Sequence, residues 1–241
     1  MNWVAGVDGC RGGWIAAFAA AEGGPVRVRV LARFADVVTA PERPAIVAVD
    51  IPVGLPEATG PQGRGPERAV RPLLGARQSS VFTVPSRRAV YGRDYAEACR
   101  LALATSDPPR KVSRQLFMIA PKIREVDGAL RAAPTLVPRV FEVHPEVAFW
   151  RLNGERALDE PKKVRGQPHG PGLALRRRLL AGEGFAETVT GQAPPPGAGA
   201  DDVVDALACA AIARRILAGR AAPFPDPPLA DGCGLPVAIW A

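Results

Sequence analysis

Val4-Ala5-Gly6-Val7-Asp8-Gly9, followed by Cys10-Arg11-Gly12-Gly13-Trp14, sets the architecture that we expect for this chain. The first run predicts a short apolar strand that ends at Asp8, and Gly12-Gly13 predicts a sharp turn into a second strand over Trp14–Ala19. A buried strand gains nothing from a charged end, because an unpaired carboxylate is costly to remove from water. Asp8 is therefore either a turn-forming residue or a residue with a chemical role.

Two further strands are predicted in the first 56 residues. Val26–Leu31 alternates apolar and polar residues, as a half-exposed strand does. Ala45–Val49 is uniformly apolar, as expected of a strand buried on both faces, and it ends at Asp50. With a short helix over Phe34–Ala40, we expect the order strand, strand, strand, helix, strand. Both of the apolar strands that we expect at the centre end in an aspartate.

A basic segment rich in loops and helices follows, over approximately residues 57–134. Between Arg64 and Arg131 there are 14 Lys and Arg against six Asp and Glu, whereas the whole chain has a net charge of +7. The rest of the chain is therefore close to neutral. We interpret the segment as an insertion in a single domain over 1–241, with nucleic acid as the first candidate for a partner. The alternative is an arginine-rich surface that contacts only solvent.

The remaining sequence returns to sheet and helix. Val137–Val143 predicts a strand, Pro161–Gly172 a polar loop, and Val203–Leu217 an alanine-rich helix. The region over Pro223–Pro236 is rich in proline and glycine and predicts coil. Val237–Trp240 is expected to add a last edge strand.

Composition excludes several classes of protein. The chain has 241 residues, of which 47% are hydrophobic and 23% charged, as in an ordinary globular protein with a sizeable core. Its four cysteines are far apart, which argues against a zinc site and a disulfide framework and fits a reducing cytoplasm. The N-terminus lacks the pattern of a signal peptide, and no apolar run is long enough to cross a membrane. We expect a cytoplasmic protein without a membrane partner.

Carboxylates recur where elements begin or end. Asp8, Asp50 and Glu142 lie at or near the ends of apolar strands, and Asp202 and Asp205 share one face at the start of the last helix. Clustered carboxylates repel one another unless cations neutralise them, and oxygen ligands suit Mg²⁺ or Mn²⁺. Two such ions about 3.5–4 Å apart are the usual device for phosphodiester cleavage. The alternative for the helix is simple capping of its N-terminus, and the neighbouring Asp201 is expected to do only that.

Six stretches, in chain order, carry a resemblance to a known family: Val7–Trp14, Asp50–Pro56, Ser79–Phe82 with Pro85, Lys122–Asp127, Glu142–Glu146 and Asp201–Ala208. They resemble the predicted nucleases known as domain of unknown function 429, and the order of elements resembles the ribonuclease H-like superfamily. The resemblance implies an α/β fold, with a ribonuclease H-like mixed β-sheet flanked by helices and a basic helical and loop insertion. It covers nearly the whole chain.

The same resemblance implies roles for the acids. Asp8 corresponds to the central ligand that bridges two metal ions, and Asp50 to the acid of the fourth strand, which binds one ion. Asp202 and Asp205 correspond to the paired acids of the last helix. Glu142 lies after the insertion and has no counterpart among these acids, and we expect it to be a supporting catalytic acid. The predicted first helix departs from ribonuclease H itself, because it has no glutamate.

Five basic residues are candidates for contacts with substrate phosphates. Arg11 lies beside Asp8 in the first motif. For Lys122 the alternative to a phosphate contact is an ion pair with the nearby acids Glu125 and Asp127. The imidazole of His144 is either a proton shuttle or ligand, or a hydrogen-bonded structural group. The five candidates are Arg11, Arg77, Arg87, Arg88 and Lys122.

We therefore expect a Mg²⁺- or Mn²⁺-dependent nuclease that cleaves phosphodiester bonds of DNA or RNA by a two-metal carboxylate mechanism. The first alternative is a non-catalytic nucleic-acid-binding or interaction protein on the same fold. The second is a phosphotransferase of the actin and hexokinase type, whose core has similar strands. That class needs a second, adenosine-binding domain with its own glycine-rich phosphate loop, and the sequence offers none.

Overall fold

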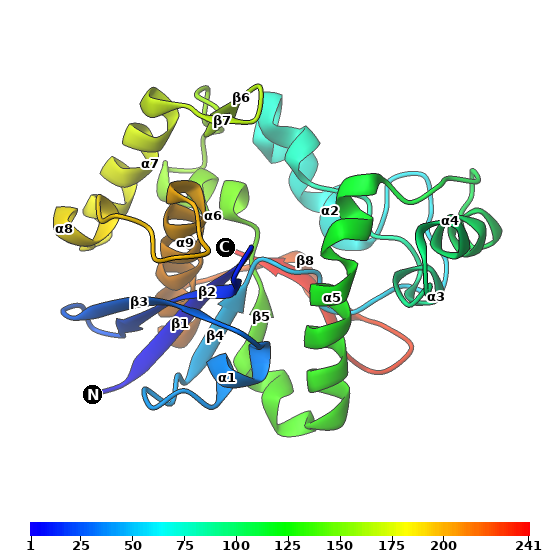
Figure 1. Cartoon of the computed structure of the whole chain (residues 1–241), viewed down its shortest axis with the longest axis horizontal. Helices are drawn as coiled ribbons and strands as arrows, with labels where there is room; N and C mark the ends of the chain where they lie inside the picture. Colours follow the sequence, from blue (N-terminus) through cyan, green and yellow to red (C-terminus); the bar gives the residue numbers. More distant parts are fainter.

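A mixed sheet of seven strands forms the centre of the molecule, in the order β3-β2-β1-β4-β5-β9-β8 (Figure 1). β1, β2 and β3 are antiparallel neighbours, whereas β1, β4, β5 and β9 run parallel to one another. The structure is a computed structural model and describes residues 1–241. The strands of the sheet are β1 (Trp3–Cys10), β2 (Gly13–Ala20), β3 (Val26–Leu31), β4 (Ile46–Val49), β5 (Val140–Glu142), β8 (Pro223–Ala230) and β9 (Pro236–Trp240).

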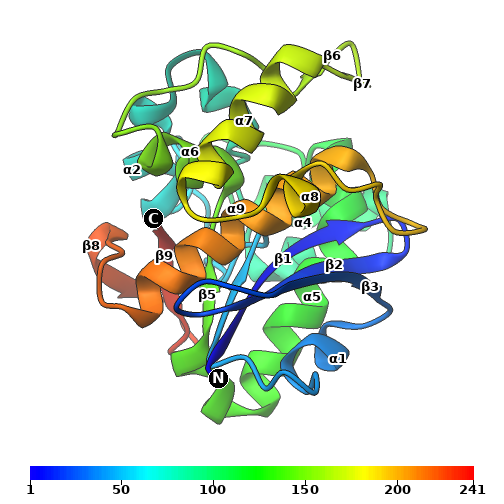
Figure 2. The ribbon, with the colours of Figure 1, turned by 90° about the vertical axis from the view of Figure 1, so that its left-hand side faces the viewer.

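Helices cover both faces of the sheet, and each face has its own hydrophobic core (Figure 2). On one face, α9 (Ala200–Leu217) lies along β1 and β4, and α6 (Pro145–Leu152) and α7 (Gly170–Gly182) pack against α9. On the other face lie α1 (Phe34–Val38) and the second half of α5 (Arg114–Ala132). β1 and β4 are therefore buried on both sides, as their apolar sequences predict.

Gly6 brings α9 very close to β1. A Cβ atom on residue 6 would lie 2.0 Å from the backbone nitrogen of Ala210 and 2.1 Å from the carbonyl oxygen of Ala206. Only glycine permits this approach of helix to strand. The contact fixes the register of α9 on the sheet and directs its first turns, which carry Asp205, toward the carboxyl end of β1.

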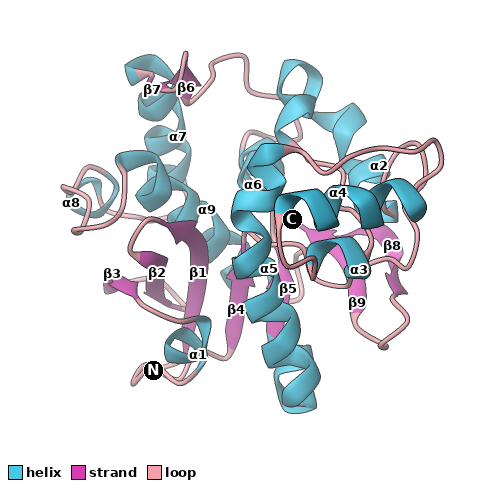
Figure 3. Ribbon diagram, turned by 45° about the vertical axis from the view of Figure 1, so that its right-hand side comes forward, coloured by secondary structure: helices cyan, strands magenta, loops and turns pink.

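The segment between β4 and β5 completes the core and also extends away from it (Figure 3). Ile123, Val126 and Leu130 of α5 pack against the sheet, whereas Leu116, near the start of α5, packs against α4. Pro121 lies inside α5 without ending the helix. The other elements of this segment are α2 (Gly65–Val70), the 3₁₀ helix η1 (Arg71–Ser80), α3 (Arg87–Val90) and α4 (Tyr95–Ala104).

The C-terminal strands differ from the sequence-based prediction. The prediction is coil over 223–236 and an edge strand over 237–240, whereas β8 is the edge strand and β9 lies between β5 and β8. Half of β8 is proline, in the sequence PFPDPPLA. Proline cannot donate a backbone hydrogen bond, so it argues for coil, yet an edge strand tolerates it because one side pairs with nothing.

The remaining elements are short. β6 (Lys163–Val164) and β7 (Gln167–Pro168) form a separate two-stranded hairpin where the sequence predicts a loop. A 3₁₀ helix, η2 (Pro134–Arg139), precedes β5, and α8 (Glu187–Thr190) precedes α9. None of the helices has the length and apolarity that a membrane crossing requires.

Candidate functional site

A cleft of about 470 Å³ lies at the carboxyl ends of the central strands. Its lining comes from the ends of β1 and β4, the first turns of α9, η1 and the first half of α5. The segment 161–163, which leads into the β6–β7 hairpin, forms a further part of the rim. The acidic residues that line the cleft are Asp8, Glu67, Asp50, Glu142, Glu146, Asp201, Asp202 and Asp205.

Asp8 and Asp50 are neighbours because β1 and β4 are parallel and in register. Val7 pairs with Val49, and the backbone N–H of Asp50 donates a 2.9 Å hydrogen bond to the carbonyl of Val7. The two aspartates that follow these positions are therefore neighbours at the point where β4 ends. β1 does not end at Asp8 as the sequence predicts but continues to Cys10, with Asp8 paired to Ile15 of β2. Asp205 reaches this place from α9 and is only 2% exposed. The structure thus brings together three of the acids that the sequence singles out.

Burial and mutual repulsion disfavour three negative charges at this place. Burial, followed by the charges of Asp50 and Asp205, raises the pKa of Asp8 well above its usual value. Burial likewise raises the pKa of Asp50 to about 7 and that of Asp205 to about 6, although the ammonium of Lys162 lowers both. A cation bound among these carboxylates would remove the repulsion between their negative charges, so the arrangement favours cation binding.

Lys162 already supplies one positive charge to the cluster. Its Nζ donates to Oδ2 of Asp205 in a close ion pair. Burial lowers the pKa of Lys162, but Asp205, Asp8 and Asp50 outweigh this effect and raise the pKa above its usual value. Lys162 is a member of this charged cluster that our reasoning from sequence overlooked. The only indication in the sequence is the pair of lysines at the start of a loop that otherwise has no pattern.

The second oxygen of Asp205 has no partner. Oδ1 is buried and accepts no hydrogen bond, which is unusual for a buried carboxylate oxygen. An all-oxygen donor set with one open, buried oxygen fits a hard divalent cation such as Mg²⁺ or Mn²⁺. As the side chains stand, no group of three or more His, Cys, Asp or Glu residues surrounds one point closely enough to hold a metal ion. Lys162 lies among them instead.

Asp202 and Asp201 differ in their surroundings. One oxygen of Asp202 caps the helix by accepting a 2.8 Å hydrogen bond from the N–H of Gly199. Burial raises the pKa of Asp202, and the side chain lines the cleft. Asp201 is ion-paired with Lys163 at 2.5 Å. Asp202 can therefore contribute one oxygen to a ligand, while Asp201 is engaged by its neighbour.

A match over most of the chain identifies its family. A family model described as "Protein of unknown function (DUF429)" matches residues 6–230. The chain belongs to this family. No curated protein and no solved structure matches the chain. The resemblance drawn from the six sequence motifs is thereby confirmed at the level of the family, whose description names no activity.

Several motif residues of this DUF429 protein form buried structural contacts. Both oxygens of Glu142 accept hydrogen bonds from Arg64, at 2.6 and 3.1 Å, and the N–H of Val53 donates to the same carboxylate at 2.8 Å. Arg64 also pairs with Glu67 at 2.7 Å. Glu142 thus braces the loop after β4 against α2, and both of its oxygens accept hydrogen bonds from Arg64.

The segment that begins at His144 has a comparable bracing role. Both oxygens of Glu146 accept hydrogen bonds from Arg176, at 2.7 and 2.8 Å. Nε2 of His144 lies 3.3 Å from the carbonyl oxygen of Ser80, and its Nδ1 is buried without a partner. Burial lowers the pKa of His144, so the imidazole is neutral at pH 7. A neutral histidine at the cleft can accept or donate a proton.

The Lys122–Asp127 motif ties α5 to its surroundings. Glu125 accepts a 2.9 Å hydrogen bond from Nε1 of Trp14 and another from the N–H of Phe34, and so connects β2, α1 and α5. Asp127 is held by Arg87 and Tyr91. These contacts explain why acids recur on the buried face of α5.

The five basic candidates do not gather in one place. Arg77 and Lys122 line the cleft, and the Nζ of Lys122 donates to the carbonyl of Gly13 and lies 4.7 Å from the ring centroid of Trp14. Arg87 is half-buried in ion pairs with Asp127 and Asp231 and is not part of the lining. Arg11 and Arg88 are exposed and lie outside the lining of the cleft.

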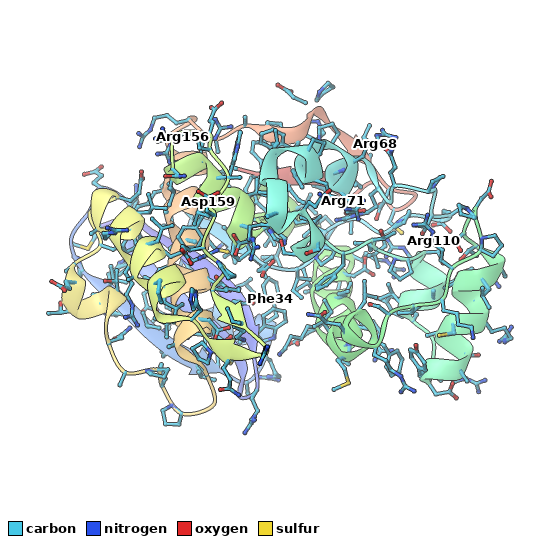
Figure 4. All side chains as sticks on the ribbon, turned by 90° about the horizontal axis from the view of Figure 1, so that it is seen from above. Phe34, Arg68, Arg71, Arg110, Arg156 and Asp159 are labelled. Carbon is cyan, nitrogen blue, oxygen red and sulfur yellow. The ribbon has the colours of Figure 1, made fainter.

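Other basic side chains are spread along the segment between β4 and β5. Figure 4 looks onto the molecule from above and shows Arg68, Arg71 and Arg110 over this part of the chain. Arg71 is engaged by the carbonyl oxygens of Gln62 and Val81, whereas Arg110 is exposed and its guanidinium has no bonded partner. The positive charge of this segment therefore extends well beyond the cleft.

Proposed function

We propose that this protein is a Mg²⁺- or Mn²⁺-dependent nuclease with a ribonuclease H-like fold, which cleaves phosphodiester bonds of DNA or RNA. The observation that carries the proposal is the open, buried Oδ1 of Asp205 beside Asp8 and Asp50, at the point where β4 ends beside β1. The mixed sheet, with β1 between an antiparallel and a parallel neighbour, is compatible with that fold.

The ligands for a divalent cation would be Asp8, Asp50 and Asp205, with one oxygen from Asp202. Such a cation activates water at neutral pH and stabilises the developing charge on the leaving oxygen of a phosphodiester. The protein contributes the position of its carboxylates, which the sheet register and the contact at Gly6 fix. The ion pair of Glu142 with Arg64 supports the loop that follows Asp50, because the N–H of Val53 donates to Glu142.

Binding of the substrate would rest on the cations of the cleft. Arg77 of η1, Lys122 of α5 and Lys163 all line the cleft. Phosphate groups are natural partners for these side chains, and the exposed arginines of the segment between β4 and β5 extend the basic surface. His144, neutral and facing the cleft, is placed to exchange a proton with the substrate or with water.

The test is a cleavage assay of the purified chain on single-stranded, duplex, branched and hybrid substrates, with Mg²⁺, Mn²⁺ or EDTA. We expect cleavage with the metals, none with EDTA, and a loss of at least ~100-fold in Asp8→Asn. Asp226→Asn removes an exposed carboxylate from edge strand β8 and is the matched control. Equal behaviour of Asp8→Asn and wild type on every substrate would contradict catalysis. Salt-dependent binding that needs no metal and survives Asp8→Asn would favour the non-catalytic alternative.

A further inference from the structure

The backbone around Lys162 is held firmly, although the hairpin beyond it is exposed. The N–H of His169 donates a 2.9 Å hydrogen bond to the carbonyl of Lys162, and Nδ1 of His169 lies 3.1 Å from the carbonyl oxygen of Pro161. Arg176 donates a 2.9 Å hydrogen bond to the carbonyl of Glu160. Residues 163–168 are exposed, so the anchored part of the loop is the part that carries Lys162.

Helix α7 provides this anchor because of two features of its first turns. A Cβ atom on Gly172 would lie 1.9 Å from the carbonyl oxygen of Pro161, so only glycine allows the loop to rest against the helix. Arg176 is fully buried, and Glu146 of α6 holds its guanidinium with both oxygens. A continuous chain of contacts therefore runs from Glu146 through Arg176 to the backbone that positions Lys162.

Lys162 uses this position to neutralise the acids. Its ammonium occupies Oδ2 of Asp205 and attracts Asp8 and Asp50, while Oδ1 of Asp205 stays without a partner. A long lysine on a mobile surface loop would have to lose much side-chain entropy to stay there. Here the loop backbone is already anchored, so ordering Lys162 costs only the entropy of its side-chain rotamers and not that of the backbone as well.

We propose that Lys162 is a permanent cation of the site, and that the site takes one divalent cation beside it rather than two. This inference rests on the proposed function and specifies it. The resemblance to ribonuclease H-like proteins implies two metal ions, whereas here Lys162 supplies one positive charge to the same carboxylates. Through Arg176, Glu146 holds the backbone of the loop that carries Lys162, which gives this residue of the Glu142–Glu146 motif a structural role at the cleft.

The experiment counts the metal ions. Isothermal titration of the full chain with MnCl₂ gives the stoichiometry and affinity for wild type, Lys162→Met, Lys162→Arg and Lys163→Met, with circular dichroism to verify folding. We expect one Mn²⁺ per chain for wild type. Lys162→Met is expected to bind a second ion, or to bind the first at least ~10-fold more tightly, because a like charge has been removed from a partly buried site.

Two controls separate charge from structure. Lys162→Arg keeps the positive charge and is expected to retain one ion with wild-type affinity. Lys163→Met removes the neighbouring lysine, which pairs with Asp201, and is expected to leave the stoichiometry at one.

The outcomes distinguish this inference from the proposed function. Two ions in wild type, or the same stoichiometry and affinity in wild type and Lys162→Met, would overturn the role of Lys162 and leave the metal-dependent nuclease standing. The absence of Mn²⁺ binding to wild type would overturn the proposed function, and the single-ion site with it.

Discussion

Replacing Asp50 by asparagine removes a buried charge while keeping the size of the side chain, and we expect it to stabilise the metal-free protein above pH 7. Burial raises the pKa of Asp50 from 3.8 to about 7, with Lys162 opposing and Glu146 adding to the effect. A difference of this size corresponds to about 4 kcal/mol that the ionised native state loses relative to the unfolded chain. This net difference already includes the attraction to Lys162. The amide of asparagine also costs free energy to bury, so we expect a net gain of about 1–3 kcal/mol for Asp50→Asn at pH 8.

The sign of the pH dependence follows from proton binding. Between pH 3.8 and about 7 the native state retains the proton of Asp50, whereas the unfolded chain releases it. The native state is therefore favoured at the acid end of this window, and that advantage is lost as the pH rises through it. Asp50→Asn has no such proton, so its stability relative to wild type must increase from pH 5 to pH 8.

Urea unfolding in EDTA at pH 5 and pH 8, followed by tryptophan fluorescence, measures this difference. Asp226→Asn is the control, because it removes an exposed carboxylate and is expected to change the free energy of unfolding by less than about 0.5 kcal/mol. A stability difference between Asp50→Asn and wild type that is the same at both pH values would refute the reasoning. So would a lower stability of Asp50→Asn at pH 8.

Two other changes test how the fold positions the site. Gly6→Ala places a Cβ against the backbone of α9 and is expected to destabilise the protein by about 3 kcal/mol or more, whereas Gly128→Ala on α5, where a Cβ meets nothing within 4 Å, is expected to be neutral or to add up to about 1 kcal/mol. Similar urea midpoints for the two variants would contradict the close approach of α9 to β1. Glu142→Gln leaves Arg64 with one buried carboxylate partner instead of two and is expected to cost about 2–4 kcal/mol in urea unfolding. A cost below about 0.5 kcal/mol would show that Glu142 is free for chemistry.

The strands and helices that carry regular patterns could be predicted from sequence. The apolar runs that end at Asp8 and Asp50 are parallel neighbours in the sheet, and the helix that begins near Asp201 lies across them. β8 could not be predicted, because its prolines match a coil and its strand conformation depends on pairing with β9. Local sequence contains no information about that partner.

The side chains at the site were harder to predict than the elements that carry them. Glu142 follows a strand just as Asp50 does, but its partner Arg64 lies 78 residues away and cannot be recognised from spacing. Lys162 belongs to a loop without periodicity, and its position depends on Gly172 and Arg176 in the next helix. Counting charges reveals the basic character of residues 64–131. It cannot reveal that Arg87 is held in ion pairs with Asp127 and Asp231.

The most direct measurement for the central claim is the position of a bound metal ion. Crystals of the wild-type chain soaked in MnCl₂, with diffraction data collected at the manganese absorption edge, locate Mn²⁺ by its anomalous scattering. We predict a peak within about 2–2.5 Å of carboxylate oxygens from Asp8, Asp50 and Asp205, with Oδ1 of Asp205 among its ligands. Manganese bound elsewhere, with Lys162 still the only cation among these aspartates, would contradict a metal-dependent active site.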